Sequence, residues 1–483
     1  MLKRLGSQSH KRSTIWSILV FVLGCGGGGA TGGVAGPSSC AGGGLNDNQK
    51  GVGDQAGGVQ LAIGDIAVAP SGTFVVFKMD GDLAVGFPDT GAVQKLPVVN
   101  PTQLVFAKTR DVIYVGSDLD SKLHAIDVRK GEELWAAPGV VDPNVKLASS
   151  KDDRRIITAR TGGFVALLDA ATGEVLAEHE VTGWIEDMEI LPDDKRALIV
   201  PSHTWPADQT EPLTVVTVLE LEAGVTRTFD VPNCSDNIVV TPAGDRAFLA
   251  PTTCQKDPIS YIDLAPGAEA YVKNLPGFGP VAMAPDGVTA VGFLDMGNVD
   301  DTLFDDPSQK PDAASPRYHL MVIDTQSLSY KFFAYGEELP RYAITPDGNV
   351  LLVDSGVSAP TRIFETKTGV FNTVEGPPII LDNFVISSDS AHAYSLQTTT
   401  EQEDPSKPPT EEEMLHELFD LNIVEATSAK VDVPFEPINI NISPDDATLF
   451  LREDAANICV FSLADRACRS RISGVEVALP SGE

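Results

Sequence analysis

The sequence predicts an all-β fold built from one repeated four-stranded unit, and three observations lead to that prediction. A short turn of Pro-Asp-Gly type recurs along the chain, mostly with a spacing of roughly 40 residues. The runs between these turns are short and β-branched or aromatic, as in Phe74-Val75-Val76-Phe77 and Val112-Ile113-Tyr114-Val115, a composition typical of strands. The 483-residue chain is 42% hydrophobic, which is enough to bury a large core.

We call each recurrent turn a hook and expect it to join the first and second strands of a unit. Proline presets one turn dihedral, and Asp or Gly tolerates the remaining ones. Nine hooks occur: Pro70-Ser71-Gly72, Thr109-Arg110-Asp111, Lys151-Asp152-Asp153, Pro192-Asp193-Asp194, Pro242-Ala243-Gly244, Pro285-Asp286-Gly287, Pro346-Asp347-Gly348, Ser388-Asp389-Ser390 and Pro444-Asp445-Asp446.

Four strands for each hook predict one radial array in a single domain, a β-propeller of seven to nine four-stranded blades. Closure into a ring protects edges that isolated four-stranded sheets would expose. Nine hooks favour nine blades, whereas terminal repeats that share a blade would give fewer. Little of the folded region is expected to be helical, apart from Thr410 to Phe419.

The third strands end in aspartate, as in Tyr261-Ile262-Asp263 and Val322-Ile323-Asp324, and Thr-Gly turns follow at Thr172-Gly173 and Thr368-Gly369. This pattern resembles the YVTN-type β-propeller over roughly Val59 to Gly474. Two repeats, around residues 122–135 and 164–176, also resemble those of quinoprotein-type propellers. Those families include sugar lactonases, quinone-dependent dehydrogenases and a lipoprotein of the β-barrel assembly machinery, so the resemblance implies fold more strongly than function.

The N-terminus predicts a lipoprotein signal peptide over residues 1–24. A basic region precedes an apolar stretch, Ile15 to Leu23, that is too short to span a bilayer. Val22-Leu23-Gly24-Cys25 resembles a bacterial lipobox, which implies a lipid on Cys25 and an outer-membrane location in the cell envelope. Ordinary secretion with cleavage nearby is the alternative. The glycine-rich stretch that follows predicts a disordered tether over residues 25–58, then the propeller over 59–474 and a tail over 475–483.

The formal net charge of −33 argues against nucleic-acid binding, since such a surface repels phosphates. Cations or basic protein partners fit better, although the charge also serves solubility alone. No cofactor motif is present.

Four of the six cysteines predict two local disulfides, Cys234–Cys254 and Cys459–Cys468. Each pair is symmetric about a turn, which places its members opposite each other on a hairpin. An exported protein is a suitable setting for such bridges. Buried free thiols are the alternative, and Cys40 stays unpaired in the tether.

Three long insertions, Pro201–Pro212, Asp295–Arg317 and Gln397–Glu417, each fall between a second and a third strand. We therefore expect them together on one rim of the ring, where long loops on a rigid scaffold usually bind. Five further residues lie in one insertion or in the junctions between a fourth and a first strand, and they are candidates for this binding face: Trp184, Trp205, Phe278, Arg341 and Phe435. Phe278, Trp184 and Phe435 serve equally well as residues that fill gaps between blades.

The second insertion is rich in acids, and a Ca²⁺ site is conceivable at Asp295, Asp300, Asp301, Asp305 and Asp306. The spacing is not that of an EF-hand loop, and a solvated acidic loop is the alternative. The leading hypothesis is thus a non-enzymatic, lipid-anchored scaffold that binds a protein or glycan in the envelope. A lactonase-like or quinoprotein-like enzyme, or an envelope-assembly factor, is the alternative.

Overall fold

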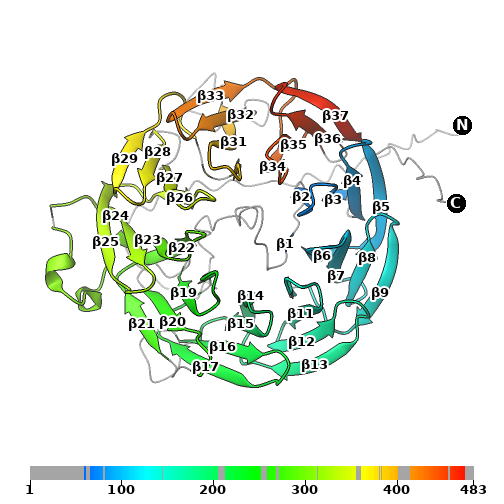
Figure 1. Cartoon of the computed structure of the whole chain (residues 1–483), viewed down its shortest axis with the longest axis horizontal. Helices are drawn as coiled ribbons and strands as arrows, with labels where there is room; N and C mark the ends of the chain where they lie inside the picture. Colours follow the sequence, from blue (N-terminus) through cyan, green and yellow to red (C-terminus); the bar gives the residue numbers. More distant parts are fainter. Residues whose placement is uncertain are drawn as a thin grey trace, which may run out of the picture. The chain divides into compact units, whose positions relative to one another are not determined.

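The computed structural model describes these residues: 59–60, 66–79, 82–143, 145–204, 213–235, 237–251, 258–267, 271–312, 314–354, 360–379, 381, 383–400, 414–454 and 457–473. Within them the chain forms nine antiparallel sheets arranged radially in a ring, which is a β-propeller (Figure 1). Each sheet uses four strands that are consecutive in sequence. The nine hooks therefore correspond to nine complete blades, with no blade shared between the two ends of the chain.

The blades are numbered in chain order, each from its innermost to its outermost strand. Blades 1 to 3 contain β2 (Ile66–Val68), β3 (Val75–Met79), β4 (Asp82–Phe87) and β5 (Ala92–Val99); β6 (Pro101–Phe106), β7 (Val112–Ser117), β8 (Lys122–Asp127) and β9 (Glu132–Pro138); and β10 (Lys146–Ser149), β11 (Arg155–Arg160), β12 (Phe164–Asp169) and β13 (Val175–Glu180). Blades 4 to 6 contain β14 (Ile185–Ile190), β15 (Arg196–Pro201), β16 (Thr214–Glu220) and β17 (Thr226–Val231); β18 (Asn237–Val240), β19 (Arg246–Ala250), β20 (Ile259–Asp263) and β21 (Val272–Leu275); and β22 (Phe278–Met283), β23 (Thr289–Asp295), β24 (Tyr318–Asp324) and β25 (Tyr330–Gly336). Blades 7 to 9 contain β26 (Arg341–Ile344), β27 (Val350–Asp354), β28 (Arg362–Glu365) and β29 (Val370–Thr373); β30 (Phe384–Ile386), β31 (His392–Thr400), β32 (Met414–Asn422) and β33 (Thr427–Val431); and β34 (Asn439–Ile442), β35 (Thr448–Arg452), β36 (Asn457–Ser462) and β37 (Ala467–Ser473).

Three short elements complete the described chain. β1 (Val59–Gln60) pairs with the inner edge of β6, so it adds a fifth strand to blade 2. Two 3₁₀ turns, η2 (Asp301–Leu303) and η3 (Pro307–Gln309), lie in the second insertion. The helix expected over Thr410 to Phe419 is wrong from Met414 onward, because that segment is β32, paired with β31 along its whole length. No described residue belongs to a helix long and apolar enough to cross a membrane.

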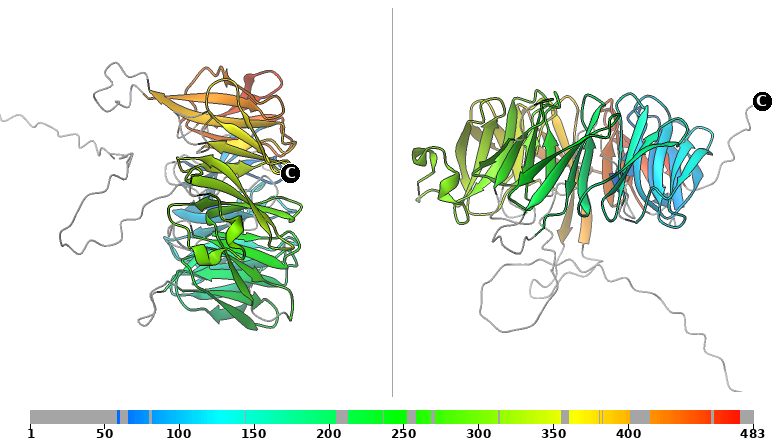
Figure 2. Two further views of the ribbon diagram at one scale, coloured as in Figure 1. Left: turned by 90° about the vertical axis from the view of Figure 1, so that its left-hand side faces the viewer. Right: turned by 90° about the horizontal axis from the view of Figure 1, so that it is seen from below.

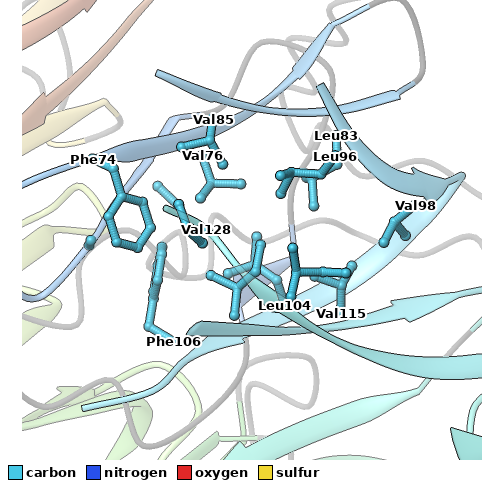
Figure 3. Close-up of a cluster of buried hydrophobic side chains, with 14 of the residues drawn as sticks. Phe74, Val76, Leu83, Val85, Leu96, Val98, Leu104, Phe106, Val115 and Val128 are labelled. Carbon is cyan, nitrogen blue, oxygen red and sulfur yellow. The ribbon is translucent and has the colours of Figure 1, made fainter. Parts of the chain in front are cut away.

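The hydrophobic core lies mostly between neighbouring blades. Between blades 1 and 2, for example, Phe74, Val76 and Val85 face Leu104, Phe106 and Val115 (Figure 3). The rings of Phe74 and Phe106 are 6.0 Å apart. Because side chains alternate on a strand, each blade presents an apolar row to both neighbours, and the ring buries both rows.

Aspartates at the middle position of the hooks hold the turns together, as the sequence predicted. Asp445 accepts hydrogen bonds from the Ser443 hydroxyl (2.6 Å) and the Ala447 amide (3.2 Å). These bonds lower the pKa of Asp445. Asp347 similarly accepts from the Thr345 hydroxyl (2.6 Å) and the Asn349 amide (3.0 Å).

The third residue of a hook contacts the hook of the preceding blade, and we call this contact the latch. In most hooks this residue is left-handed, with φ of 56° at Asp153, 55° at Asp446 and 69° at Gly244. Asp153 accepts from the backbone amides of Lys108 (2.6 Å) and Thr109 (2.7 Å) in the hook of blade 2. That hook therefore starts at Lys108, one residue earlier than the sequence predicted. Asp446 accepts in the same way from the amides of Ser388 and Asp389.

A glycine replaces this aspartate in four hooks whose preceding hook contains proline. An added Cβ would lie 2.9 Å from Pro192 Cδ at Gly244 and 2.6 Å from Pro242 Cδ at Gly287. Proline has no N–H to donate, so an aspartate there would lose one of its two backbone donors, and its side chain would clash. In these four hooks the glycine thus matches the proline that begins the hook before it. Ser390 also follows such a hook, and its hydroxyl accepts from the amide of the second hook residue, Asp347 (3.0 Å).

The seam between blades 9 and 1 closes the ring without strand exchange. Arg452, fully buried at the end of β35, donates through Nη2 to the carbonyl of Lys78 (2.8 Å) and lies over the Phe77 ring. Asn441 Nδ2 donates to the Ile66 carbonyl (3.1 Å). The seam also shows the glycine–proline pair of the other hooks, since Gly72 packs on Pro444.

Candidate functional site

All three insertions connect second to third strands, as predicted. They join β15 to β16, β23 to β24, and β31 to β32. In an antiparallel blade these connections open on the same side as the links from one blade to the next. We call this side the insertion face and the opposite side, which carries the hooks, the turn face. The β31–β32 hairpin extends well beyond the ring on one side (Figure 2).

The second insertion does not gather over the insertion face, which corrects the prediction of one shared rim. Its segment with η2 and η3 lies outside the ring, beside β24 and β25 (Figure 1). Phe304 is buried there, 6.0 Å from the ring of Phe332 on the outermost strand of blade 6. Asp305 is bonded to Lys273 Nζ (2.7 Å), on the outermost strand of blade 5. Burial of this phenylalanine holds the loop against the outer wall. Residues 205–212 and 401–413 of the other insertions lie outside the described residues.

The acids proposed as calcium ligands each have a partner of their own. Buried Asp295 forms a two-pronged ion pair with Arg317 Nε and Nη2 (both 2.9 Å) and accepts from the Gly297 amide (2.8 Å). Burial alone would raise the pKa of Asp295, but Arg317 and this amide lower it.

The remaining carboxylates of this insertion also point to separate places. Asp300 and Asp306 cap η2 and η3, and Asp301 pairs with Lys310. In the described part of the chain, one group of three metal-binding residue types converges, at Glu453, Cys459 and Cys468. The two cysteines there are bonded to each other, so neither offers a thiolate. The five aspartates therefore form no shared ligand set in this geometry.

The binding-face candidates divide into one exposed residue and three packed ones. Trp184, in the link between β13 and β14, is 57% exposed. Phe278 is only 8% exposed and packs near Tyr318, and Phe435 packs against the core between blades 8 and 9. Arg341 is held by the buried carboxylate of Asp354, with Nη2 2.7 Å from Oδ1. Trp205 lies outside the described residues. The gap-filling alternative thus describes Phe278 and Phe435.

Sequence reasoning missed an aromatic residue that accompanies Trp184. Phe164 begins β12 on the insertion face and is 44% exposed, and the guanidinium of Arg160 lies 4.9 Å from its ring centre. Trp184 lies in the connection from blade 3 to blade 4. Its carbonyl accepts a hydrogen bond from the amide of Ser202 at the start of the first insertion (2.5 Å). The available signal was a bulky aromatic directly after Gly162-Gly163 in a connection of the same class as the insertions.

The predicted bridge between Cys459 and Cys468 is present, with Cα atoms 5.7 Å apart. The two residues are not directly opposite, however, because Cys468 faces Phe461 and a bulge follows. The hairpin is centred one residue later than the sequence symmetry suggested. Cys234 is buried and disulfide-bonded. Its predicted partner Cys254 lies outside the described residues, as do Cys25 and Cys40.

Comparison with known proteins supports the fold and no closer relationship. No family model matches the sequence, and no curated protein matches it. A crystal structure of a eukaryotic initiation factor is similar with a TM-score of 0.51, at 14% identity over 73% of this chain and 83% of that one. The Dos1 propeller has a TM-score of 0.45, at 14% identity over 70% of this chain and 90% of that one. Hydrazine synthase from Kuenenia stuttgartiensis has a TM-score of 0.35, at 12% identity over 67% and 93%. The chain is a β-propeller by architecture, and at these identities the likeness shows the fold alone.

Proposed function

We propose that this protein is a binding scaffold whose insertion face holds a protein partner. The observation that carries the proposal is the pair of exposed aromatic rings, Phe164 and Trp184, at one end of blade 3. Exposed aromatics with a nearby arginine are the residue types that anchor interfaces, and Arg160 already lies over Phe164. A propeller presents such residues on a rigid frame, so little ordering entropy opposes binding.

The proposal includes a lipid anchor at Cys25 and a place in the bacterial cell envelope, with the outer membrane favoured. It rests on the lipobox-like Val22-Leu23-Gly24-Cys25 and the glycine-rich stretch that follows. Mass spectrometry of protein from membranes is expected to find the mature chain starting at an acylated Cys25. An unmodified Cys25 would rule out the anchor but leave the binding face untouched.

The binding face is tested by cross-linking and affinity capture from envelope extract with the full-length protein. The double variant Phe164→Ala with Trp184→Ala is expected to lose captured partners, because each anchor contributes about 2 kcal/mol or more at a well-packed interface. Tyr271→Ala is the matched control, since Tyr271 is 50% exposed but lies at the outer wall of blade 5. Equal capture by the double variant and the wild type would contradict the proposal. Capture that survives protease but not glycan-cleaving enzymes would assign the face to a glycan instead.

A further inference from the structure

A cavity of about 300 Å³ opens between blades 8 and 9, on the turn face and away from the insertions. One wall is polar and the other is apolar. The polar wall consists of His392, Tyr394, Asp420, Asp446 and Arg466, and the apolar wall consists of Val431, Leu449, Phe461 and Leu463. A space of this size takes a small molecule or one long side chain.

The polar wall places a tyrosine beside a carboxylate that is already paired. Asp420 accepts from Arg466 Nη2 (3.0 Å) and is bonded to His392 Nδ1 (2.8 Å). The His392 ring stacks on Tyr394, with ring centres 6.0 Å apart. Tyr394 is only 6% exposed, and it lines the cavity together with Asp420 and Asp446.

The junction between blades 2 and 3 shows what occupies the corresponding space when the chain fills it. Tyr114 is the third residue of β7, as Tyr394 is the third residue of β31. The Tyr114 hydroxyl accepts from Arg110 Nη2 (2.7 Å), and Arg110 Nε lies 4.0 Å from the carboxylate of Asp153. A guanidinium therefore lies between the tyrosine and the aspartate latch.

The junction between blades 8 and 9 keeps the tyrosine and the latch but lacks the guanidinium. Ser390 occupies the position of Arg110, four residues before the tyrosine, and Asp446 occupies the position of Asp153. The tryptophan that covers the filled junction, which we call the aromatic lid, is missing as well. Trp135 lies opposite Ala125 on β9, and the matching residue opposite Asp420 on β33 is Ala429. Two small residues thus stand where blade 2 has the arginine and the tryptophan.

We propose that this cavity binds the guanidinium or primary ammonium group of a small organic cation with an apolar stem. The cation takes the place that Arg110 takes in blade 2, between the Tyr394 hydroxyl and the Asp446 carboxylate. Leu449, Phe461 and Leu463 cover the stem. Arg466 and His392 are both paired with Asp420, which offsets the positive charge of Arg466 in the wall. The net charge of −33 attracts cations to the molecule as a whole.

The electrostatics at the hydroxyl agree with a cationic ligand. Burial raises the pKa of Tyr394, and the carboxylates of Asp420, Asp389 and Asp446 raise it further, against one opposing contribution from Arg466. Three carboxylates thus act on the hydroxyl against one guanidinium, which favours a cation over an anion in the cavity.

Isothermal titration calorimetry of the full-length protein tests the proposal. Butylguanidinium is expected to bind saturably, whereas butyrate and butanol, which share its stem, are expected not to bind. Blocked arginine, N-acetylarginine amide, distinguishes the source. Tighter binding of blocked arginine than of butylguanidinium assigns the site to an arginine side chain of a partner, and the reverse order assigns it to a free metabolite.

The variant Ser390→Arg is expected to abolish binding, because the new side chain supplies the missing guanidinium from within. Ser390→Gln is the matched control, because both variants keep the left-handed backbone position and both lose the hydrogen bond from the Asp347 amide to the Ser390 hydroxyl (3.0 Å). Its side chain is long but uncharged, and it is expected to retain binding. Asp446→Asn keeps the latch acceptor but removes the charge, and about tenfold weaker binding is expected. The proposal is overturned if butylguanidinium fails to bind the wild type, if butyrate binds equally well, or if Ser390→Gln loses as much affinity as Ser390→Arg.

Discussion

The junctions between blades 2 and 3 and between blades 8 and 9 use the same strand positions and the same aspartate latch, yet one is filled and the other is hollow. Blade 2 fills its junction with Arg110, Tyr114 and Trp135, whose indole N–H donates to the Ala170 carbonyl (3.3 Å). Blade 8 places Ser390 and Ala429 at the corresponding positions and leaves a cavity. The buried core and the latch therefore hold neighbouring blades in register without the arginine and the tryptophan, and the outer part of a junction is free to take on another role.

The largest loss of stability is expected for a substitution at Gly173, in the filled junction. Gly173 has φ of 73°, and an added Cβ would lie 2.4 Å from the Trp135 ring. Gly173→Ala should therefore lower the free energy of unfolding by about 2–4 kcal/mol, from backbone strain and overpacking together. Urea unfolding followed by fluorescence measures this loss.

Arg466 is the matching residue of the hollow junction and supplies the control. It also has positive φ, at 52°, but it reaches back to Asp420 from an exposed position. Arg466→Gly relieves the backbone and removes an ion pair whose arginine is exposed, while buried Asp420 keeps His392 as a partner, so a change within about 1 kcal/mol is expected. Similar losses for the two variants would show that the junctions do not differ as described.

Removal of the aromatic lid should come next in size. Trp135 packs on the Tyr114 ring (5.9 Å between ring centres) and on Gly173. Trp135→Ala is expected to cost about 2–3 kcal/mol, below the range for a fully buried tryptophan because this one is half-buried. Thermal unfolding by circular dichroism detects the change. Ala429→Ser at the matching exposed position should shift stability by less than about 0.5 kcal/mol, and a large shift there would contradict the comparison.

The aspartate latch is expected to contribute about 2 kcal/mol. Asp153→Ala removes the acceptor for the amides of Lys108 and Thr109 and for the Thr109 hydroxyl (2.6 Å), and it leaves alanine with positive φ. Asp153→Asn keeps one acceptor and a residue type that tolerates this backbone, so its loss should be about half as large. Equal losses in urea unfolding would mean that the carboxylate does not act as a latch.

The smallest expected effect is on the melting temperature at low pH. Hydrogen bonds lower the pKa of Asp445 below its ordinary value, so its contribution is present above about pH 4 and is lost as the pH falls through the lower folded-state pKa. Melting temperature should fall with acid below about pH 4, and Asp445→Asn should flatten that fall by a degree or two. An unchanged acid profile in the variant would show that this carboxylate is not stabilised by folding.

The repeat made the fold predictable from sequence, because each hook carries its own turn chemistry. Pro346-Asp347-Gly348 specifies a turn whatever surrounds it, and nine such signals gave the nine blades. β32 was mistaken for a helix because Met414 to Asn422 lacks β-branched residues, and its strand is set by pairing with β31.

Features that depend on two blades at once could not be predicted in this way. Phe278 and Trp184 occupy similar links, but only the neighbouring blades determine that one is buried and the other exposed. The path of the second insertion depends on where Phe304 finds an apolar surface. The difference between the two junctions is likewise visible only when β31 and β33 are placed beside their counterparts in blade 2.

The seam between blades 9 and 1 has a consequence for how the ring assembles and opens. Every other pair of neighbouring blades is joined by the chain itself, but here Arg452 and Lys78 meet across 374 residues of sequence. Bringing such distant segments together is entropically costly and slow, so the ring should close at this seam last. By the same reasoning, a pull on the two ends of the chain would meet no covalent resistance between these blades. The seam is therefore the junction at which the ring is expected to open, and the contacts of Arg452 with blade 1 hold it closed.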